Sequence, residues 1–146
     1  LDYYRTESAL QLVLANVREA RQSAIDERRS YRITFSYPGS FAVWKQDDAF
    51  AWVQERQIFL PFGISFHLPS GIPRISIIDN SADIDFNGGN TCRFRADGSV
   101  VNSSGRIVSG IVYISNSAET GQCRAVSVFG GTGLTRAWVY ENGQWN

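Results

Sequence analysis

The chain has 146 residues and no formal net charge at neutral pH, because 14 basic residues balance 14 acidic ones. With 43% hydrophobic and 19% charged residues, the composition is too apolar for a disordered chain, and the length fits one compact domain. The balanced charge excludes a global field that would drive unspecific binding to nucleic acid or to anionic lipid. Such binding would have to be local.

No stretch of the sequence reaches the roughly 18 apolar residues of a membrane span, and no secretory signal peptide opens the chain. The chain begins at Leu1 and contains no Met. We therefore expect a processed protein or a piece of a longer one, and a membrane segment upstream of Leu1 is compatible with this sequence.

A long amphipathic helix is predicted over residues 5–29, which contain no Gly or Pro. Apolar residues recur there at steps of three and four, which places them on one face of a helix. We expect this face to pack on the rest of the domain. The predicted packing residues are Leu10, Val13, Leu14, Val17, Ala20 and Ala24.

The hydrophobic period changes from 3.6 to 2 at Tyr31, where a strand begins. Short strands bounded by Gly, Pro, Asn or Asp then follow to the end of the chain, with hairpin turns at residues 97–98 and 142–143. Among them we expect separate strands at residues 50–55, 57–62 and 74–78. About eight to ten strands without intervening helices indicate antiparallel sheets. The predicted fold is α+β, one domain over 1–146, with a helix in 1–29 and a β-rich part in 30–146.

The residues that enzymes need are scarce. His67 is the only histidine, and the alternation in residues 64–68 directs it away from the apolar face, towards solvent. No G-x-S-x-G motif occurs, and one histidine with two distant cysteines cannot form a zinc site of the usual kind. We therefore expect no catalytic residue, metal, cofactor or small-molecule substrate.

A calcium loop is the nearest match to a metal site. Polar residues alternate at Asp79, Ser81, Asp83 and Asp85, but the sharp-turn position holds Ile84 and the last ligand position holds Asn90. A polar turn followed by a half-exposed strand explains the same residues.

Positive charge is concentrated late in the chain. Residues 92–140 carry only two acidic residues but five arginines, which are Arg93, Arg95, Arg106, Arg124 and Arg136. In residues 136–140, alternation places Arg136, Trp138 and Tyr140 on one strand face, which suits base stacking and phosphate contact. A strand face covered by a neighbouring segment is the alternative interpretation.

Three segments carry a resemblance to a known family. Residues 9–35, a helix running straight into a β-rich domain, resemble the part that follows the membrane anchor in the GspH/FimT class of type IV pilin-like proteins. Residues 84–100 and 125–140 resemble the closing strands of that class. The resemblance implies a pilin-like β-sandwich preceded by a basic leader, a prepilin peptidase site, N-terminal methylation and an apolar helix.

The resemblance also implies a function. It points to a non-enzymatic minor pilin or pseudopilin of a type IV pilus or type II secretion filament, assembled with other such subunits through its helix. This places the protein in the bacterial inner membrane, single-pass, with this domain in the periplasm or on the filament. Outside the cytoplasm, a disulfide between Cys92 and Cys123 is favoured over two buried free thiols.

Two alternatives to a purely structural subunit stay open. Some competence-linked minor pilins of this class bind DNA through a basic C-terminal region, although Leu134 stands here where related chains often carry Arg after Thr-Gly. A secreted β-sandwich that binds carbohydrate is the other alternative. It would use exposed aromatic rings among Trp44, Trp52, Trp138 and Trp145.

Overall fold

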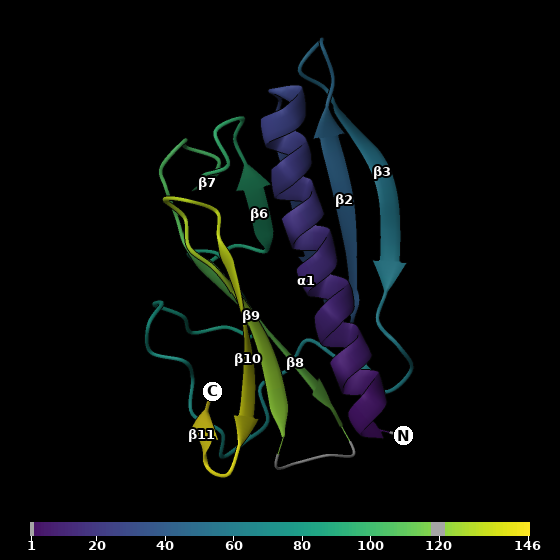
Figure 1. Ribbon diagram of the computed structural model, residues 1–146, viewed down its shortest axis with the longest axis vertical. Helices are drawn as coiled ribbons and strands as arrows, with labels where there is room; N and C mark the ends of the chain where they lie inside the picture. Colours follow the sequence, from purple (N-terminus) through teal and green to yellow (C-terminus); the bar gives the residue numbers. More distant parts are fainter. Residues whose placement is uncertain (1, 118–121) are drawn as a thin grey trace.

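The computed structural model describes residues 2–117 and 122–146 of the chain. A single long helix, α1 (Asp2–Glu27), lies lengthwise over two antiparallel sheets, with the N-terminus at one end of the molecule (Figure 1). This arrangement confirms the α+β fold class predicted from the sequence.

The first sheet has five strands in the order β3-β2-β1-β6-β7, and the second has six in the order β11-β10-β9-β8-β4, with β5 paired to β8. The first comprises β1 (Tyr31–Ser36), β2 (Ser40–Gln46), β3 (Trp52–Phe59), β6 (Thr91–Phe94) and β7 (Val100–Val101). The second comprises β4 (Ile64–Ser65), β8 (Gly110–Asn116), β9 (Cys123–Val128), β10 (Thr135–Glu141) and β11 (Gln144–Trp145), joined by β5 (Ile84–Asp85).

The helix ends two residues earlier than predicted. Arg28 adopts a left-handed backbone conformation with φ of 55°, which no helical residue can share. The N–H of Arg29 then donates to the carbonyl of Ala24 at 3.2 Å. This hydrogen bond spans six residues, as in a Schellman C-cap. The chain is thereby turned into β1.

The apolar stripe of α1 is buried in the main core. All six packing residues predicted from the sequence are exposed by 6% or less, and they share one hydrophobic cluster with side chains from both sheets. Ala20 and Ala24 are small enough to let the helix backbone approach the sheets closely. The sheet residues of the same cluster include Ile33, Phe35, Phe94, Val112, Ile114 and Val126.

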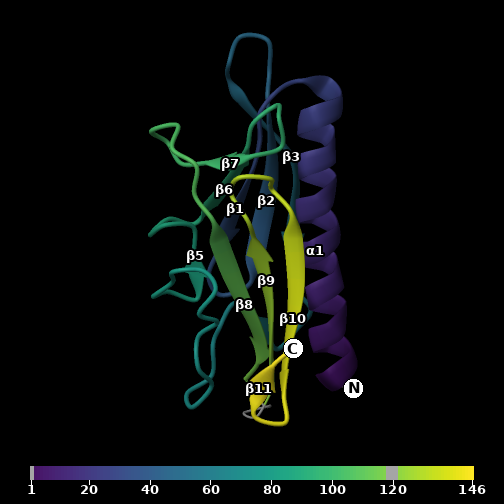
Figure 2. The same ribbon diagram turned by 60° about the vertical axis from the view of Figure 1, so that its left-hand side comes forward.

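The second sheet is covered on both faces. On β9, Val126 and Val128 belong to the core under α1, whereas Cys123 and Ala125 belong to a second cluster on the opposite face. An irregular segment between β4 and β5 covers that second face, on the side away from α1 (Figure 2). This double cover explains why β8 and β9 are buried along their whole length.

Two strand predictions are wrong in detail. The strands expected at 50–55 and 57–62 form one continuous strand, β3, which accommodates an irregular register opposite Val43 and Trp44. The strand expected at 74–78 does not form, because the N–H of Ile75 donates to the Tyr113 hydroxyl and not to a neighbouring strand. Within the described residues, no helix combines the length and hydropathy needed to cross a membrane.

Candidate functional site

The outward face of α1 is a polar stripe that runs the length of the helix. We call it the outer stripe; its residues are all exposed, and they are Ser8, Gln11, Ala15, Arg18, Glu19, Gln22 and Asp26. Two hydrogen bonds follow the helix at a spacing of four residues, from Gln11 to Glu7 and from Gln22 to Asp26, each 2.9 Å. The stripe carries both signs of charge.

Polar contacts fasten α1 to both sheets. On one flank, Arg56 of β3 donates to Asn16 at 2.9 Å and forms an ion pair with Glu19 at 3.4 Å. On the other flank, Arg18 donates to the Thr135 hydroxyl of β10 at 3.0 Å. The helix therefore sits on the junction of the two sheets and is held from both sides, which fixes the outer stripe relative to the β-rich part.

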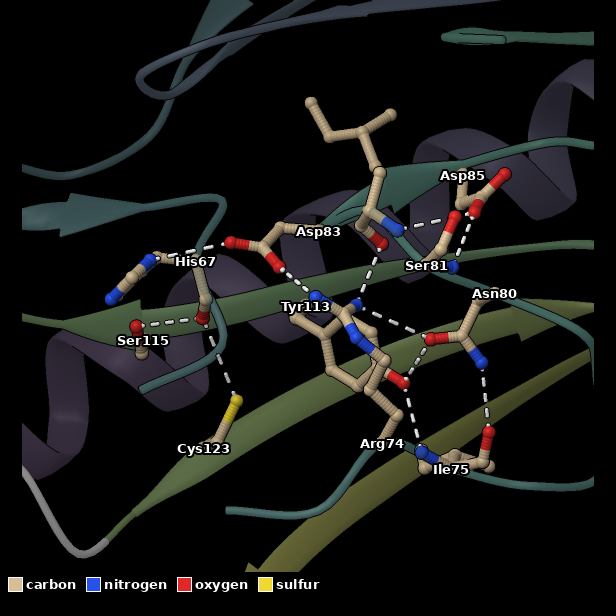
Figure 3. Close-up of polar contacts among 12 residues, drawn as sticks. His67, Arg74, Ile75, Asn80, Ser81, Asp83, Asp85, Tyr113, Ser115 and Cys123 are labelled. Carbon is tan, nitrogen blue, oxygen red and sulfur yellow. Dashed lines mark hydrogen bonds and ion pairs between the residues drawn. The ribbon is translucent and has the colours of Figure 1, made fainter. Parts of the chain in front are cut away.

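A polar network holds the irregular segment on the second sheet, and Tyr113 is at its centre (Figure 3). The Tyr113 ring is fully buried on β8. Its hydroxyl donates to Asn80 Oδ1 at 2.8 Å and accepts the N–H of Ile75 at 2.9 Å. The Asn80 amide in turn donates to the carbonyls of Ile75 and Ile78. One side chain of β8 thus pins several residues that have no strand partner.

Two of the three acidic residues considered above for calcium, Asp83 and Asp85, are held by protein donors. Asp83 accepts from Arg74 at 3.1 Å and lies 3.3 Å from Nδ1 of His67, whose side chain is 54% exposed. Asp85 accepts three backbone N–H groups, from Ser81, Ala82 and Gly88. Within the described part of the chain, no three histidine, cysteine or acidic side chains cluster as metal ligands do.

The environment of Asp85 lowers the pKa of its carboxyl. Burial raises this pKa, but the backbone N–H groups of Ser81, Gly88 and Ala82 stabilise the charged form more strongly. The pKa of Asp85 therefore lies below the ordinary value of 3.8. The carboxylate is therefore a turn-stabilising group.

The disulfide predicted between Cys92 and Cys123 is wrong in this structure, where both thiols are free and buried. Cys92 lies on β6 in the core under α1, whereas Cys123 lies on β9 and points into the cluster on the far face of the other sheet. Their Cβ atoms cannot approach without moving a sheet. Burial raises the pKa of both thiols, that of Cys123 to about 12.

The residues predicted to contact DNA do not act as one surface. Arg124 is buried beneath α1, with 2% of its surface exposed, and its Nε lies 3.4 Å from Glu7. Trp138 is 8% exposed, and its indole N–H donates to Ser127 at 2.9 Å, so its ring is not available to stack on a base. The guanidinium of Arg136 lies 3.6 Å from the Trp138 ring centroid. The covered-strand interpretation therefore describes β10.

The remaining arginines of that set stand on or near the first sheet. Arg95 is exposed and lies 3.6 Å from Asp97, and Arg106 is exposed in the loop after β7. Arg93 is half-buried on β6 and lies over the ring of Trp52, with 5.4 Å from its guanidinium carbon to the ring centroid.

The rings that the carbohydrate alternative needs are engaged within the domain. Trp44 donates its indole N–H to Thr34, and Trp145 donates to the carbonyl of Pro73. Arg32 lies over both Trp44 and Trp52, at 5.1 and 4.4 Å from the ring centroids. These contacts, with that of Arg136 over Trp138, engage each of the four tryptophans within the domain, which disfavours them as stacking surfaces for a sugar ring.

Sequence reasoning missed the pairing of Arg32 with Arg93. The antiparallel register of β1 and β6 sets these two residues directly opposite each other, on the face of the first sheet away from α1. The available signal was the alternation in residues 31–35, which places Arg32 opposite the apolar face. The partner strand, about 60 positions later, could not be identified from local pattern.

Comparisons with known proteins agree with this geometry at the level of the fold. The chain is similar to the minor pseudopilin EpsH from the type II secretion system of Vibrio cholerae, with a TM-score of 0.63 at 11% identity over 91% of this chain and 95% of that one. It is also similar to the type IV minor pilin FimU of Pseudomonas aeruginosa, with a TM-score of 0.62 at 14% identity over 99% and 94% of the two chains. No protein-family model matches the chain, and no curated protein matches it significantly in sequence. The chain therefore has the pilin-like fold of minor pilins and pseudopilins.

Proposed function

We propose that this chain is the periplasmic part of a minor pilin or pseudopilin, a non-enzymatic subunit of a type IV pilus or type II secretion filament. The observation that carries the proposal is the fold shared with EpsH and FimU over more than nine-tenths of each chain. A filament role needs a stalk with one apolar face and a domain held rigidly on it, and α1 with its two fastened flanks supplies both.

The proposed route of assembly is packing of α1 against neighbouring subunits through the outer stripe. This face is exposed while the opposite face is fully used by the core. Its mixed charges suit contacts with other polar helices better than contacts with lipid. We propose further that an apolar segment encoded upstream continues α1 into the inner membrane, so that the β-rich part is displayed on the periplasmic side.

The anchor is tested by expressing the full-length gene together with a prepilin peptidase. We expect a cleaved product that fractionates with the inner membrane. An uncleaved product that fractionates with soluble proteins would overturn the proposal.

Assembly through the outer stripe is tested by Ala15→Arg in the full-length protein. Ala15 is exposed on α1, so the substitution leaves the core intact and introduces a bulky charge on the stripe. We expect unchanged thermal stability of the soluble domain, and loss of the protein from purified filaments. The matched control is Ser104→Arg in the loop after β7, on the side away from α1 (Figure 2), which should leave incorporation unchanged. Equal incorporation of both variants would contradict this route.

A further inference from the structure

The outer face of the first sheet carries two arginines without an anionic partner. Arg32 and Arg93 lie opposite each other on β1 and β6, and their guanidinium carbons lie 4.4 and 5.4 Å from the centroid of the same Trp52 ring. Both Nε atoms are shielded from solvent, and neither has a hydrogen-bond acceptor in the described part of the chain. Among the residues that the structure describes, neither guanidinium forms an ion pair.

The two arginines open onto a pocket of about 460 Å³. Its polar lining includes Asn87 and Ser103, its apolar lining includes Phe86 and Val101, and no described acidic residue lines it. A pocket of this size holds a small organic molecule, with an apolar wall for the carbon skeleton and a few polar groups for orientation.

The cost of this arrangement points to a ligand. Partial burial of a charge without a counter-charge is unfavourable, and two half-buried cations close together add mutual repulsion. Burial and the neighbouring charge of Arg93 together lower the pKa of Arg32. The Trp52 and Trp44 rings offset part of this cost through cation–π contacts, but they satisfy no N–H group.

We propose that Arg32 and Arg93 bind the phosphate group of a small phosphate monoester in this pocket. The planar guanidinium matches oxyanions through paired N–H donors, and two cations match the near-dianionic charge of a phosphate monoester better than the single charge of a carboxylate. The site does not depend on the filament role, since the residues that form it lie on the first sheet, in the segment between β5 and β6, or in the loop after β7, and none belongs to the outer stripe.

The test is a titration of the soluble protein with inorganic phosphate and with glycerol 3-phosphate, at constant ionic strength maintained with chloride. The readout is the NMR shift of the Trp52 indole N–H, assigned with Trp52→Phe. We expect saturable shifts with both probes at millimolar concentrations, and tighter binding of the ester because its carbon skeleton contacts the apolar wall. No saturable shift with either probe would overturn the proposal.

Variants distinguish this site from general attraction to positive charge. Arg32→Gln and Arg93→Gln should each weaken binding roughly tenfold or more, because each removes a charge-assisted hydrogen-bond donor set. Arg95→Gln is the matched control, since Arg95 is exposed and already paired with Asp97, and its affinity should stay within about twofold. Equal losses in all three variants would contradict a built site.

Two further measurements separate folding and ligand source from the result. Arg93→Lys keeps the charge and removes the planar fork, so we expect a native thermal midpoint with intermediate affinity. Native affinity in Arg93→Lys would contradict paired recognition. A single-stranded oligodeoxynucleotide that binds through these arginines, at concentrations where neither phosphate probe does, would reject the monoester and assign the site to a phosphodiester.

Discussion

Replacing Tyr113 with Phe tests whether the polar network holds the irregular segment on the second sheet. The ring is fully buried, and the substitution keeps its volume while removing only the hydroxyl. That hydroxyl accepts the Ile75 N–H, which has no other acceptor within residues 2–117 and 122–146, and it donates to Asn80 (Figure 3). The perturbation is therefore confined to two hydrogen bonds.

The expected loss of stability follows from the two bonds separately. The bond to Asn80 is worth about 1 kcal/mol, because Asn80 Oδ1 keeps a second, longer contact of 3.4 Å with Arg74. The Ile75 N–H is left buried without an acceptor, which costs about 1–2 kcal/mol more. The total of about 2–3 kcal/mol corresponds to a fall in thermal midpoint of roughly 6–12 °C for a domain of this size.

Thermal and urea unfolding measure the loss, and hydrogen exchange of the Ile75 amide locates it. The matched control is Tyr140→Phe, since Tyr140 is half-buried beside the same cluster and its hydroxyl has no hydrogen bond among the described residues. The control should lose less than about 0.5 kcal/mol. If Tyr113→Phe is as mild as the control, or the Ile75 amide keeps its protection, the network does not hold the segment.

Three further predictions concern the packing of the core, the stability of the fold at acid pH and the two cysteines. Gly110→Ala should cost about 2–3 kcal/mol by urea unfolding, because its Cβ would lie 1.9 Å from the Phe86 ring; the same cost at an open glycine would refute this cause. Because the pKa of Asp85 is lower in the folded protein, its carboxylate stabilises the fold above pH 3.8, and this stabilisation is lost as the pH falls through the lower folded value. The urea midpoint of Asp85→Asn should therefore fall less steeply at acid pH. Cys92 and Cys123 should resist a thiol reagent in the native protein, and two free thiols should react in non-reducing denaturant. If no free thiol reacts there, the two cysteines form a disulfide after all.

The helix and its direction of packing could be predicted because their signal is local. Residues 5–29 carry an unbroken 3.6 period, and the buried side chains of α1 follow it. The end of the helix could not be predicted in this way. The left-handed conformation of Arg28 depends on the path of the chain into β1, and no Gly or Asn at that position signals it. The presence of strands could likewise be predicted from local sequence pattern, whereas the order of the strands within each sheet could not.

The segment between β4 and β5 shows where local pattern fails. Residues 74–78 have the composition of a strand, yet their backbone groups bond to side chains, with Ile75 held by Tyr113 and Asn80. A strand-like apolar run needs a free sheet edge to pair with, and the edge of β8 is already occupied by β4 and β5. The apolar side chains Ile72 and Ile75 are therefore buried as a covering layer without forming a ladder.

The two candidate sites differ in what the sequence reveals for the same reason. A helical stripe is contained in one segment, so its buried and outer faces follow from spacing alone. The Arg32 and Arg93 pair requires the register of β1 with β6, and the separation of Cys92 from Cys123 requires knowing which strand belongs to which sheet. Neither is encoded in local alternation, which gives a face but no partner.

The position of α1 connects the fold to the proposed filament role. Among the described residues, no strand of one sheet pairs with a strand of the other, although the N–H of Val100 on β7 donates to the carbonyl of Gly130 just after β9, at 2.8 Å. The helix packs on both sheets through one continuous core cluster. A load applied along α1 would therefore reach both sheets through the buried stripe and through the flanking contacts of Arg56 and Arg18. An isolated sheet attached to a flexible stalk would not transmit it. The double attachment is thus the feature that would let the outer stripe serve as the proposed assembly surface while the β-rich part stays fixed in orientation.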